Sequence, residues 1–306
     1  MFSNTQGVII LLVMNKVILY YKFVHLADPK MVRLWQKELC EKLSLKGRII
    51  VSGHGINGTL GGHVEDLKKY KREMNVSEIF RDITYKWSAG TGSEFPRLSV
   101  KVRPELVAFG MPDEIKVDAK GVVGSGKHLK PEAVHKLVEQ RGDDVVFFDG
   151  RNQYEAKVGK FKNAVVPDTK YTRDFVSEIE SGKYDDIKDK PVVTYCTGGI
   201  RCEALSVLMK NRGFKEVYQM DGGIAKYGEK YGDEALWEGS LYIFDGRMNH
   251  KFSDKAKDIG ECIHCHGKTS NFENCADISC NRLVLICENC QGHKTLCEMH
   301  ETSKTK

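Results

Sequence analysis

The segment around Cys196 carries the residues best suited to covalent chemistry. An apolar run at residues 191–195 ends at this cysteine, and a helix is expected to follow. A cysteine between a strand and a helix lies where open α/β sheets bind their ligands. Gly198 and Gly199 let backbone N–H groups turn toward one point, and the helix N-terminus adds positive potential. Together with Arg201, these groups are expected to lower the pKa of the thiol and hold it as thiolate.

The length of this loop indicates which chemistry it serves. Four residues separate Cys196 from Arg201, which is shorter than the loop that cysteine phosphatases wrap around a phosphate. A shorter loop fits a sulfur-sized centre, such as an anionic persulfide stabilised by backbone amides. We expect Cys196 at the loop mouth rather than in a core, although a buried structural cysteine is the alternative. The predicted catalytic residues are Cys196 and Arg201, and the predicted backbone cradle is Thr197, Gly198, Gly199 and Ile200.

A second group of cysteines lies near the C-terminus, with the spacing C-x2-C-x9-C-x4-C-x6-C-x2-C-x6-C-x2-H. Two-residue gaps bring both ligands of a pair onto one metal ion. Four pairs could hold two Zn²⁺ ions, joined in sequence or cross-braced; one zinc, disulfides and free thiols are the alternatives. A segment with so few apolar residues needs a cross-link or a bound metal ion to fold, so zinc would be structural. The predicted ligands are Cys262, Cys265, Cys275, Cys280, Cys287, Cys290, Cys297 and His300.

Positive charge is concentrated in the first third of the chain. Residues 1–110 hold 17 Lys and Arg against 10 Asp and Glu, whereas the whole chain has a net charge of +5. This imbalance favours a polyanionic partner, although a solvated basic face without a partner is the alternative. RNA phosphates are expected to contact four residues on one helix, namely Lys68, Lys69, Lys71 and Arg72.

Composition limits the class of protein. The 306 residues are 41% hydrophobic and 29% charged, which is typical of a soluble globular protein. The apolar run at residues 8–14 is too short to span a membrane, which takes about 20 residues. No Lys or Arg precedes that run, so a secretory signal is not expected either. We therefore expect a cytoplasmic protein that does not contact a membrane and does not depend on a disulfide scaffold.

The elements that must position these residues form a mixed α/β and α+β multidomain fold. The order β-α-β-(β)-α-β predicts a ferredoxin-like, or acylphosphatase-like, basic domain, with a glycine-dense turn at residues 53–62 that could cradle a phosphate or be an ordinary turn. Alternating strands and helices then predict a parallel α/β domain around Cys196. The predicted parts are an N-terminal extension (1–14), the basic domain (15–110), a linker (111–128), the α/β domain (129–236) and a Cys-rich, zinc-binding segment (237–306).

The Cys196 loop and its surroundings resemble the rhodanese family, whose catalytic cysteine carries sulfur as a persulfide. Further marks of that family are Asp149-Gly150-Arg151, the turn at residues 159–164 and Asp221-Gly222-Gly223-Ile224. Within this resemblance, Arg151 and Glu155 are expected to be structural pairing residues rather than catalysts. The resemblance implies a rhodanese α/β domain with a parallel sheet and Cys196 as its active-site residue.

A wider set of motifs resembles the rhodanese-containing tRNA uridine hydroxylases over residues 15–300. These motifs are Gly55–Leu60, Arg151–Glu155, Cys196–Glu203, Trp237–Gly239 and Phe244–Arg247. The resemblance implies that tRNA is the partner, that molecular oxygen is a co-substrate and that 5-hydroxyuridine is formed at the wobble position. His54 stands where that family often has Glu.

Three functions are open on the sequence. The first is oxygen-dependent hydroxylation of the wobble uridine, for which the residues indicate an activated thiolate but no flavin, haem or other organic cofactor. The second is a persulfide-forming sulfurtransferase that acts on thiosulfate or on a protein or tRNA acceptor. The third is a zinc-bearing adaptor without catalysis. The residues do not indicate a sulfur or electron donor.

Overall fold

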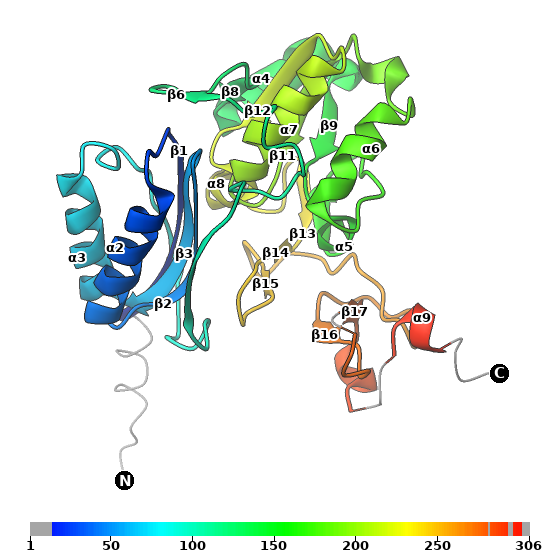
Figure 1. Ribbon diagram of the computed structural model, residues 1–306. Coiled ribbons are helices and arrows are strands. Elements are labelled where there is room, and N and C mark those ends of the chain that lie inside the picture. The colour runs from blue at the N-terminus through cyan, green and yellow to red at the C-terminus, as the bar shows by residue number, and fades with distance from the viewer. Residues whose placement is uncertain (1–13, 281, 293–295, 302–306) are drawn as a thin grey trace.

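The N-terminal domain is a five-stranded sheet covered by helices on one face (Figure 1). The structure is a computed structural model that describes residues 14–280, 282–292 and 296–301, so the expected extension, apart from Met14, lies outside the described residues. The strand order is β4-β1-β3-β2-β5, and all pairs are antiparallel except β2 with β5. The elements are β1 (Asn15–Phe23), α2 (Pro29–Lys42), β2 (Lys46–Ser52), β3 (Gly55–His63), α3 (Val64–Val76), β4 (Lys86–Ala89) and β5 (Leu98–Val102).

Local sequence explains the helices of this domain. The Asp28 carboxylate accepts hydrogen bonds from two backbone N–H groups at the start of α2, and Pro29 occupies the first turn, where its missing donor is harmless. The apolar faces of α2 and α3 present Leu39, Leu67 and Met74 to a buried core with the sheet. The expected split β-α-β arrangement is therefore confirmed.

The glycine-dense segment forms a turn only at Gly53 and His54, between β2 and β3, and the expectation was wrong for residues 55–62. Residues 55–63 form β3, which pairs with β1 on one side and β2 on the other. A Cβ on Gly58 would overlap the Tyr20 ring, and one on Gly62 would lie 2.6 Å from Leu45. The glycines therefore make room for large neighbours in the sheet. Because the backbone groups belong to two ladders, they do not form the expected phosphate cradle.

The second domain is built on a four-stranded parallel sheet of order β8-β12-β11-β9. Neighbouring residues on a strand point to opposite faces: Phe148 and Val192 pack with α6 and α7, whereas Phe147 and Val193 pack with α4 and α8. Both faces are thus covered, as parallel sheets require. The elements are β8 (Lys127–Leu129), α4 (Pro131–Arg141), η1 (Gly142–Asp144), β9 (Val146–Asp149), α5 (Gln153–Ala156), β10 (Gly159–Phe161), η2 (Thr172–Asp174), α6 (Phe175–Glu180), η3 (Asp185–Ile187), β11 (Pro191–Tyr195), α7 (Ile200–Asn211), β12 (Glu216–Met220) and α8 (Gly223–Tyr231).

The segment expected as a linker packs against its neighbours. It contains the hairpin β6 (Val117–Asp118) and β7 (Gly121–Val122), and its last residues enter β8. Met111 and Ile115 are buried in a hydrophobic cluster that also holds Phe23 of β1 and Leu205 of α7. The N-terminal sheet and the parallel α/β domain therefore share one apolar core.

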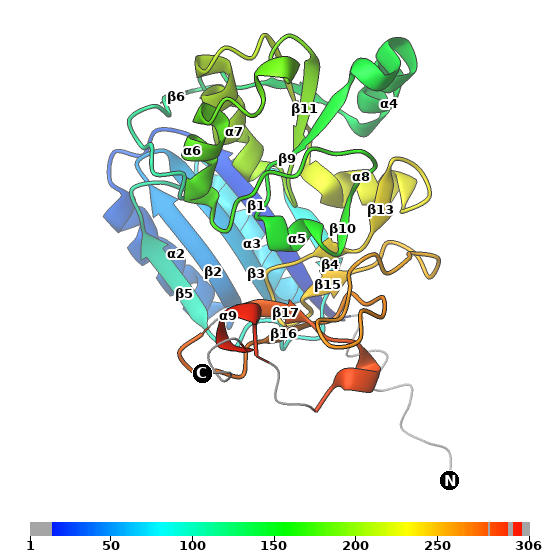
Figure 2. The ribbon, with the colours of Figure 1, turned by 90° about the vertical axis from the view of Figure 1, so that its right-hand side faces the viewer.

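The C-terminal part begins between the two domains and ends at the lower edge of the molecule (Figures 1 and 2). The strand β13 pairs with β10, and the hairpin of β14 and β15 follows. Among the described residues, no helix is long and apolar enough to cross a bilayer. The elements are β13 (Trp237–Gly239), β14 (Leu241–Tyr242), β15 (Asn249–His250), β16 (Phe272–Asn274), β17 (Leu283–Leu285), η4 (Glu288–Cys290) and α9 (Glu298–Glu301).

Candidate functional site

The backbone around Cys196 is arranged to receive negative charge. Cys196 follows β11 directly, and the backbone N–H of Gly199 points at its Sγ at 3.1 Å. The start of α8 holds the loop from outside, because the N–H of Ile224 donates to the Cys196 carbonyl at 2.9 Å. Gly223 has a φ of 67°, and a Cβ there would overlap the same carbonyl oxygen. Only glycine therefore fits this close approach.

The Cys196 side chain is 1% exposed, so the expectation of a residue at a loop mouth was wrong. The N-terminal domain covers the loop. A Cβ on Gly198 would lie 2.6 Å from Leu19, and one on Gly199 would lie 3.0 Å from the hydroxyl of Tyr21. The loop is thus enclosed by a strand far away in the sequence, and no residue pattern near Cys196 indicates that contact.

The environment lowers the pKa of Cys196 to about 5. Burial alone would raise this pKa, but a hydrogen bond from the Cys202 thiol, the Arg201 charge and two backbone N–H groups outweigh it. Burial raises the pKa of Cys202, and its hydrogen bond to Cys196 and the negative charge of Cys196 raise it further. Cys196 is therefore the thiolate of the pair and Cys202 its protonated donor.

Arg201 is held in place by a buried carboxylate. Its guanidinium pairs with both oxygens of Glu155, with a distance of 2.8 Å from Nη2 to Oε2, and also donates to Thr197 Oγ1 at 3.2 Å. Glu155 in turn accepts from the backbone N–H of Asn152 in a capping box. Arg151 forms a separate, fully buried pair with Asp149. Arg151 and Glu155, which were expected to be pairing residues, thus both form ion pairs. The pair of Glu155 lies inside the site.

Lys86 was missed by sequence reasoning, although it touches the loop. Its ammonium donates to the carbonyl of Gly198 and lies 5.2 Å from the centre of the Tyr21 ring. Burial lowers the pKa of Lys86, and the nearby Cys196 opposes that shift. A lysine at the start of β4 has no distinguishing sequence context, so only the tertiary structure shows it as part of this site.

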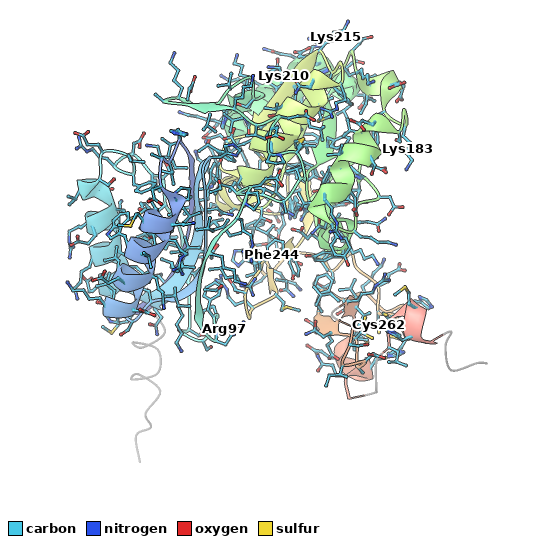
Figure 3. The ribbon with its side chains drawn as sticks, in the orientation of Figure 1. Arg97, Lys183, Lys210, Lys215, Phe244 and Cys262 are labelled. Carbon is cyan, nitrogen blue, oxygen red and sulfur yellow. The ribbon has the colours of Figure 1, made fainter. Side chains whose placement is uncertain are left out.

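The segment after β14 brings Phe244, which is labelled in Figure 3, to the site. The Phe244 ring lies 5.5 Å from the Arg201 guanidinium. Asp245 and Arg247 form an ion pair, and Arg247 Nη1 donates to the carbonyl of Ala89 at 2.7 Å. The Phe244–Arg247 motif, which the sequence indicated only by its resemblance to a family motif, therefore links the C-terminal part to β4 beside the loop.

Two hollows lie close to the loop, and Thr197 of the loop lines the smaller one. An apolar cavity of about 140 Å³ is lined by Leu19, Trp87, Thr197 and Phe244, among others. A larger cleft of about 740 Å³ lies between the N-terminal sheet and the parallel α/β domain and includes Glu203. Trp87 lines both hollows, so they meet at one wall.

The C-terminal cysteines form two tetrads of potential ligand atoms. All ten cysteines of the chain lie within the described residues and are free. Within each tetrad the ligand atoms lie within 4.8 Å of one another. The first tetrad is Cys262, Cys265, Cys287 and Cys290, and the second is Cys275, Cys280, Cys297 and His300.

The tetrads settle how the pairs combine. Cys262 and Cys265 combine with Cys287 and Cys290, which lie beyond the next pair along the chain. This is the cross-braced alternative. The sulfurs of Cys265 and Cys287 are 3.5 Å apart and those of Cys280 and Cys297 are 3.8 Å apart. Bonds of about 2.3 Å from zinc to sulfur give tetrahedral edges of about 3.8 Å, whereas a disulfide is about 2.05 Å long. Both tetrads could therefore hold a metal ion.

The expected RNA-binding cluster lies away from Cys196. Lys68, Lys69, Lys71 and Arg72 are exposed on α3, on the face of the sheet that points away from the parallel α/β domain (Figure 1). Lys68 pairs with Glu65 at 2.8 Å and Lys69 pairs with Asp66 at 2.9 Å. Any RNA contact there would be remote from the thiolate.

Comparisons with known proteins cover all three parts of the chain. Residues 15–106 match the family described as a UPF0176 acylphosphatase-like domain, residues 130–230 match the rhodanese-like domain, and residues 238–301 match the rhodanese C-terminal family. A solved rhodanese-like domain from an Anabaena species is similar over 37% of this chain and 78% of its own, at 16% identity and a TM-score of 0.31.

Curated relatives match over nearly the full length. The tRNA uridine(34) hydroxylase of Corynebacterium jeikeium is 63% identical over 90% of this chain and 89% of its own length. The enzymes of that name from Corynebacterium glutamicum and Corynebacterium diphtheriae are each 61% identical, again over 90% of this chain. Similarity at this level and coverage shows the family, and the chain belongs to the tRNA uridine(34) hydroxylases.

Proposed function

We propose that this protein hydroxylates the wobble uridine of tRNA to 5-hydroxyuridine, with Cys196 as its reactive thiolate. The identity of 63% with an enzyme named tRNA uridine(34) hydroxylase, over 90% of the chain, carries this proposal. The geometry of the loop agrees with it, because a buried thiolate stands beside an arginine and backbone donors. tRNA is the proposed partner, and the cytoplasm is the proposed location.

The residues of the loop support two roles for the thiolate. Its sulfur can add to C6 of uracil, which makes C5 nucleophilic toward an oxidant; once oxygen is bound at C5, loss of the C5 proton expels the sulfur and restores the double bond. Alternatively, the sulfur can carry a persulfide that relays electrons. Molecular oxygen is the proposed oxidant: one oxygen atom enters the product and the other leaves as water. Two external thiols supply the two electrons and two protons and become a disulfide. In both roles the Gly199 N–H and Arg201 stabilise negative charge on sulfur.

We also propose that both C-terminal tetrads bind Zn²⁺ and that these ions are structural. Four cysteines, or three cysteines with one histidine, are ligand sets that zinc favours, and four protein ligands leave no open position for a substrate. The tetrads close loops in a segment whose core is small, including Val284 and Ile286. Zinc would therefore supply folding free energy rather than catalysis.

The cluster on α3 remains a proposed RNA contact. Its four side chains are exposed and lie in the most basic third of the chain. Because they lie on the far face of the sheet, they would contact tRNA phosphates away from the reacting base. Reversing all four to Glu should weaken tRNA binding and lower the slope of log affinity against log salt by about 0.7 to 0.9 per lost contact. An unchanged slope would remove α3 from the RNA interface.

The function is tested by nucleoside mass spectrometry of unmodified tRNA incubated with the protein under ¹⁸O₂ and a thiol reductant. We expect 5-hydroxyuridine that carries one ¹⁸O atom, and none with the Cys196→Ser variant. A product labelled only from water would overturn the role of oxygen. Thiocyanate formation from thiosulfate and cyanide, without any hydroxylated nucleoside, would instead support a sulfurtransferase.

A further inference from the structure

The apolar cavity beside the Cys196 loop has dimensions that suit a single ring. Its volume is about 140 Å³, and its walls come from β1 (Leu19), β4 (Trp87), the loop itself (Thr197) and the segment after β14 (Phe244). A protein cavity of about 150 Å³ admits benzene. This volume therefore matches one six-membered ring better than a fused bicyclic system.

Phe244 presents an accessible ring at this cavity, because it is 43% exposed. The ring is held in place, since the Tyr242 ring meets it edge-on at 5.0 Å and Arg201 lies 5.5 Å from its centre. The ion pair of Asp245 and Arg247 holds the following turn against β4. Phe244 is thus a supported aromatic surface that is still partly open for stacking.

The walls also carry groups that suit a pyrimidine edge. Uracil presents two carbonyl acceptors and one N–H donor, and Thr59, Lys86 and Glu229 are among the residues that line the cavity. Lys86 also lines the adjoining cleft of about 740 Å³, which has space for the attached sugar and phosphate. A base could therefore enter the cavity while the sugar–phosphate backbone of the RNA stays in the cleft.

We infer that this cavity receives the target pyrimidine, flipped out of the anticodon loop, and that Phe244 stacks on it. The inference rests on the proposed function and names its base-binding site. Flipping costs little in a single-stranded loop, and enzymes that modify bases read the flipped base by stacking and by contacts to its edge. The cavity borders Thr197, the residue that directly follows the reactive cysteine in the loop.

The site can be located by photocrosslinking. The probe is an anticodon stem–loop RNA with 5-iodouridine at the wobble position, irradiated in complex with the full-length protein and mapped by mass spectrometry. We expect the crosslink at Phe244 or Trp87, with a yield at least fivefold lower in Phe244→Ala. The matched control is Tyr171→Ala, which removes another exposed aromatic that stacks with an arginine, outside the cavity. A crosslink elsewhere, or an equal yield in both variants, would overturn the inference.

Kinetics and base size provide a second test. Base stacking on an aromatic residue corresponds to about 5- to 150-fold in affinity, so Phe244→Ala should lose this factor in kcat/KM, whereas Phe244→Tyr should retain most activity. Stem–loops with a wobble purine should compete at least tenfold more weakly than those with a wobble cytidine. Normal hydroxylation by Phe244→Ala would refute the base site but leave the proposed function intact. A wobble-base crosslink in the cavity without hydroxylation by the wild-type protein would refute the function alone.

Discussion

The molecule arranges cysteine sulfur in two regions by opposite means. In the Cys196 loop, backbone N–H groups, the Cys202 thiol and one arginine stabilise a single negative charge without a metal ligand set. In the C-terminal segment, seven cysteines and one histidine gather into two tetrads that could each bind a metal ion. The loop leaves its sulfur free to form a bond, whereas a metal would occupy the sulfurs of a tetrad.

The two regions also differ in how their parts are connected. The charged and donor groups of the loop are nearly continuous in sequence, from Cys196 to Cys202, and Glu155 and the start of α8 then hold them in place. The tetrads interleave four pairs between Cys262 and His300, so each closes a loop that contains part of the other. Local geometry therefore defines the loop, and long-range pairing defines the tetrads.

The comparison predicts its largest effect at Cys196. Cys196→Ser keeps the size of the side chain but removes the thiolate, so hydroxylation should fall at least ~100-fold. Because the hydroxyl can still accept the Gly199 N–H, the free energy of unfolding should change by only ~1 kcal/mol. Nucleoside mass spectrometry and thermal unfolding measure the two effects. A folded variant that retains more than a few percent of activity would remove Cys196 from the mechanism.

The tetrads can be tested by two matched double variants and elemental analysis. Cys265→Ala with Cys290→Ala removes two ligands from one tetrad, so one zinc per chain should remain. Cys265→Ala with Cys280→Ala removes one ligand from each tetrad, so binding at both should weaken strongly and little zinc should remain. Pairing in sequence would reverse these results. Both variants should lose stability and solubility more than they lose intrinsic chemistry.

Sequence analysis succeeded where the information is local. The strand, glycines, arginine and helix around Cys196 specify a loop without any distant contact, and the cysteine spacing indicates all eight potential ligands. It could not choose between sequential and cross-braced pairing, because both combine the same four pairs. It also placed the glycines of β3 in a turn, because nothing near Gly58 in the sequence shows that the Tyr20 ring lies against it.

The part of the site that sequence reasoning missed comes from other domains. Lys86, Leu19 and Tyr21 reach the loop only because the N-terminal sheet packs on the parallel α/β domain. Charge counting selected α3 instead, since clustered lysines are conspicuous in a sequence, whereas a single buried lysine is not. The buried Lys86 is therefore recognised from its burial in the structure, which residue composition does not reveal.

A smaller effect is expected from the thiol that donates to Cys196. Cys202→Ala removes a contact that lowers the pKa of Cys196, so this pKa should rise from about 5 toward its ordinary range. The thiolate is lost as pH falls through its pKa, so the acid limb of kcat/KM should move to higher pH. Activity should fall several-fold at about pH 7 and recover near pH 9. Cys202→Ser keeps a donor and should shift less; equal, pH-independent losses in both variants would instead indicate a resolving thiol.

The smallest effect is expected at Lys86, where support for the loop comes from outside its own domain. Lys86→Met removes the hydrogen bond to the Gly198 carbonyl, so the loop should lose part of its fixed geometry and kcat/KM should fall a few-fold. Stability should change little, because removing a buried cation also removes its desolvation cost, which offsets the lost hydrogen bond. Steady-state kinetics and thermal unfolding measure both quantities, with Lys16→Met on the neighbouring strand as control. A large loss of stability without a loss of activity would mean that Lys86 serves the domain interface rather than the thiolate loop.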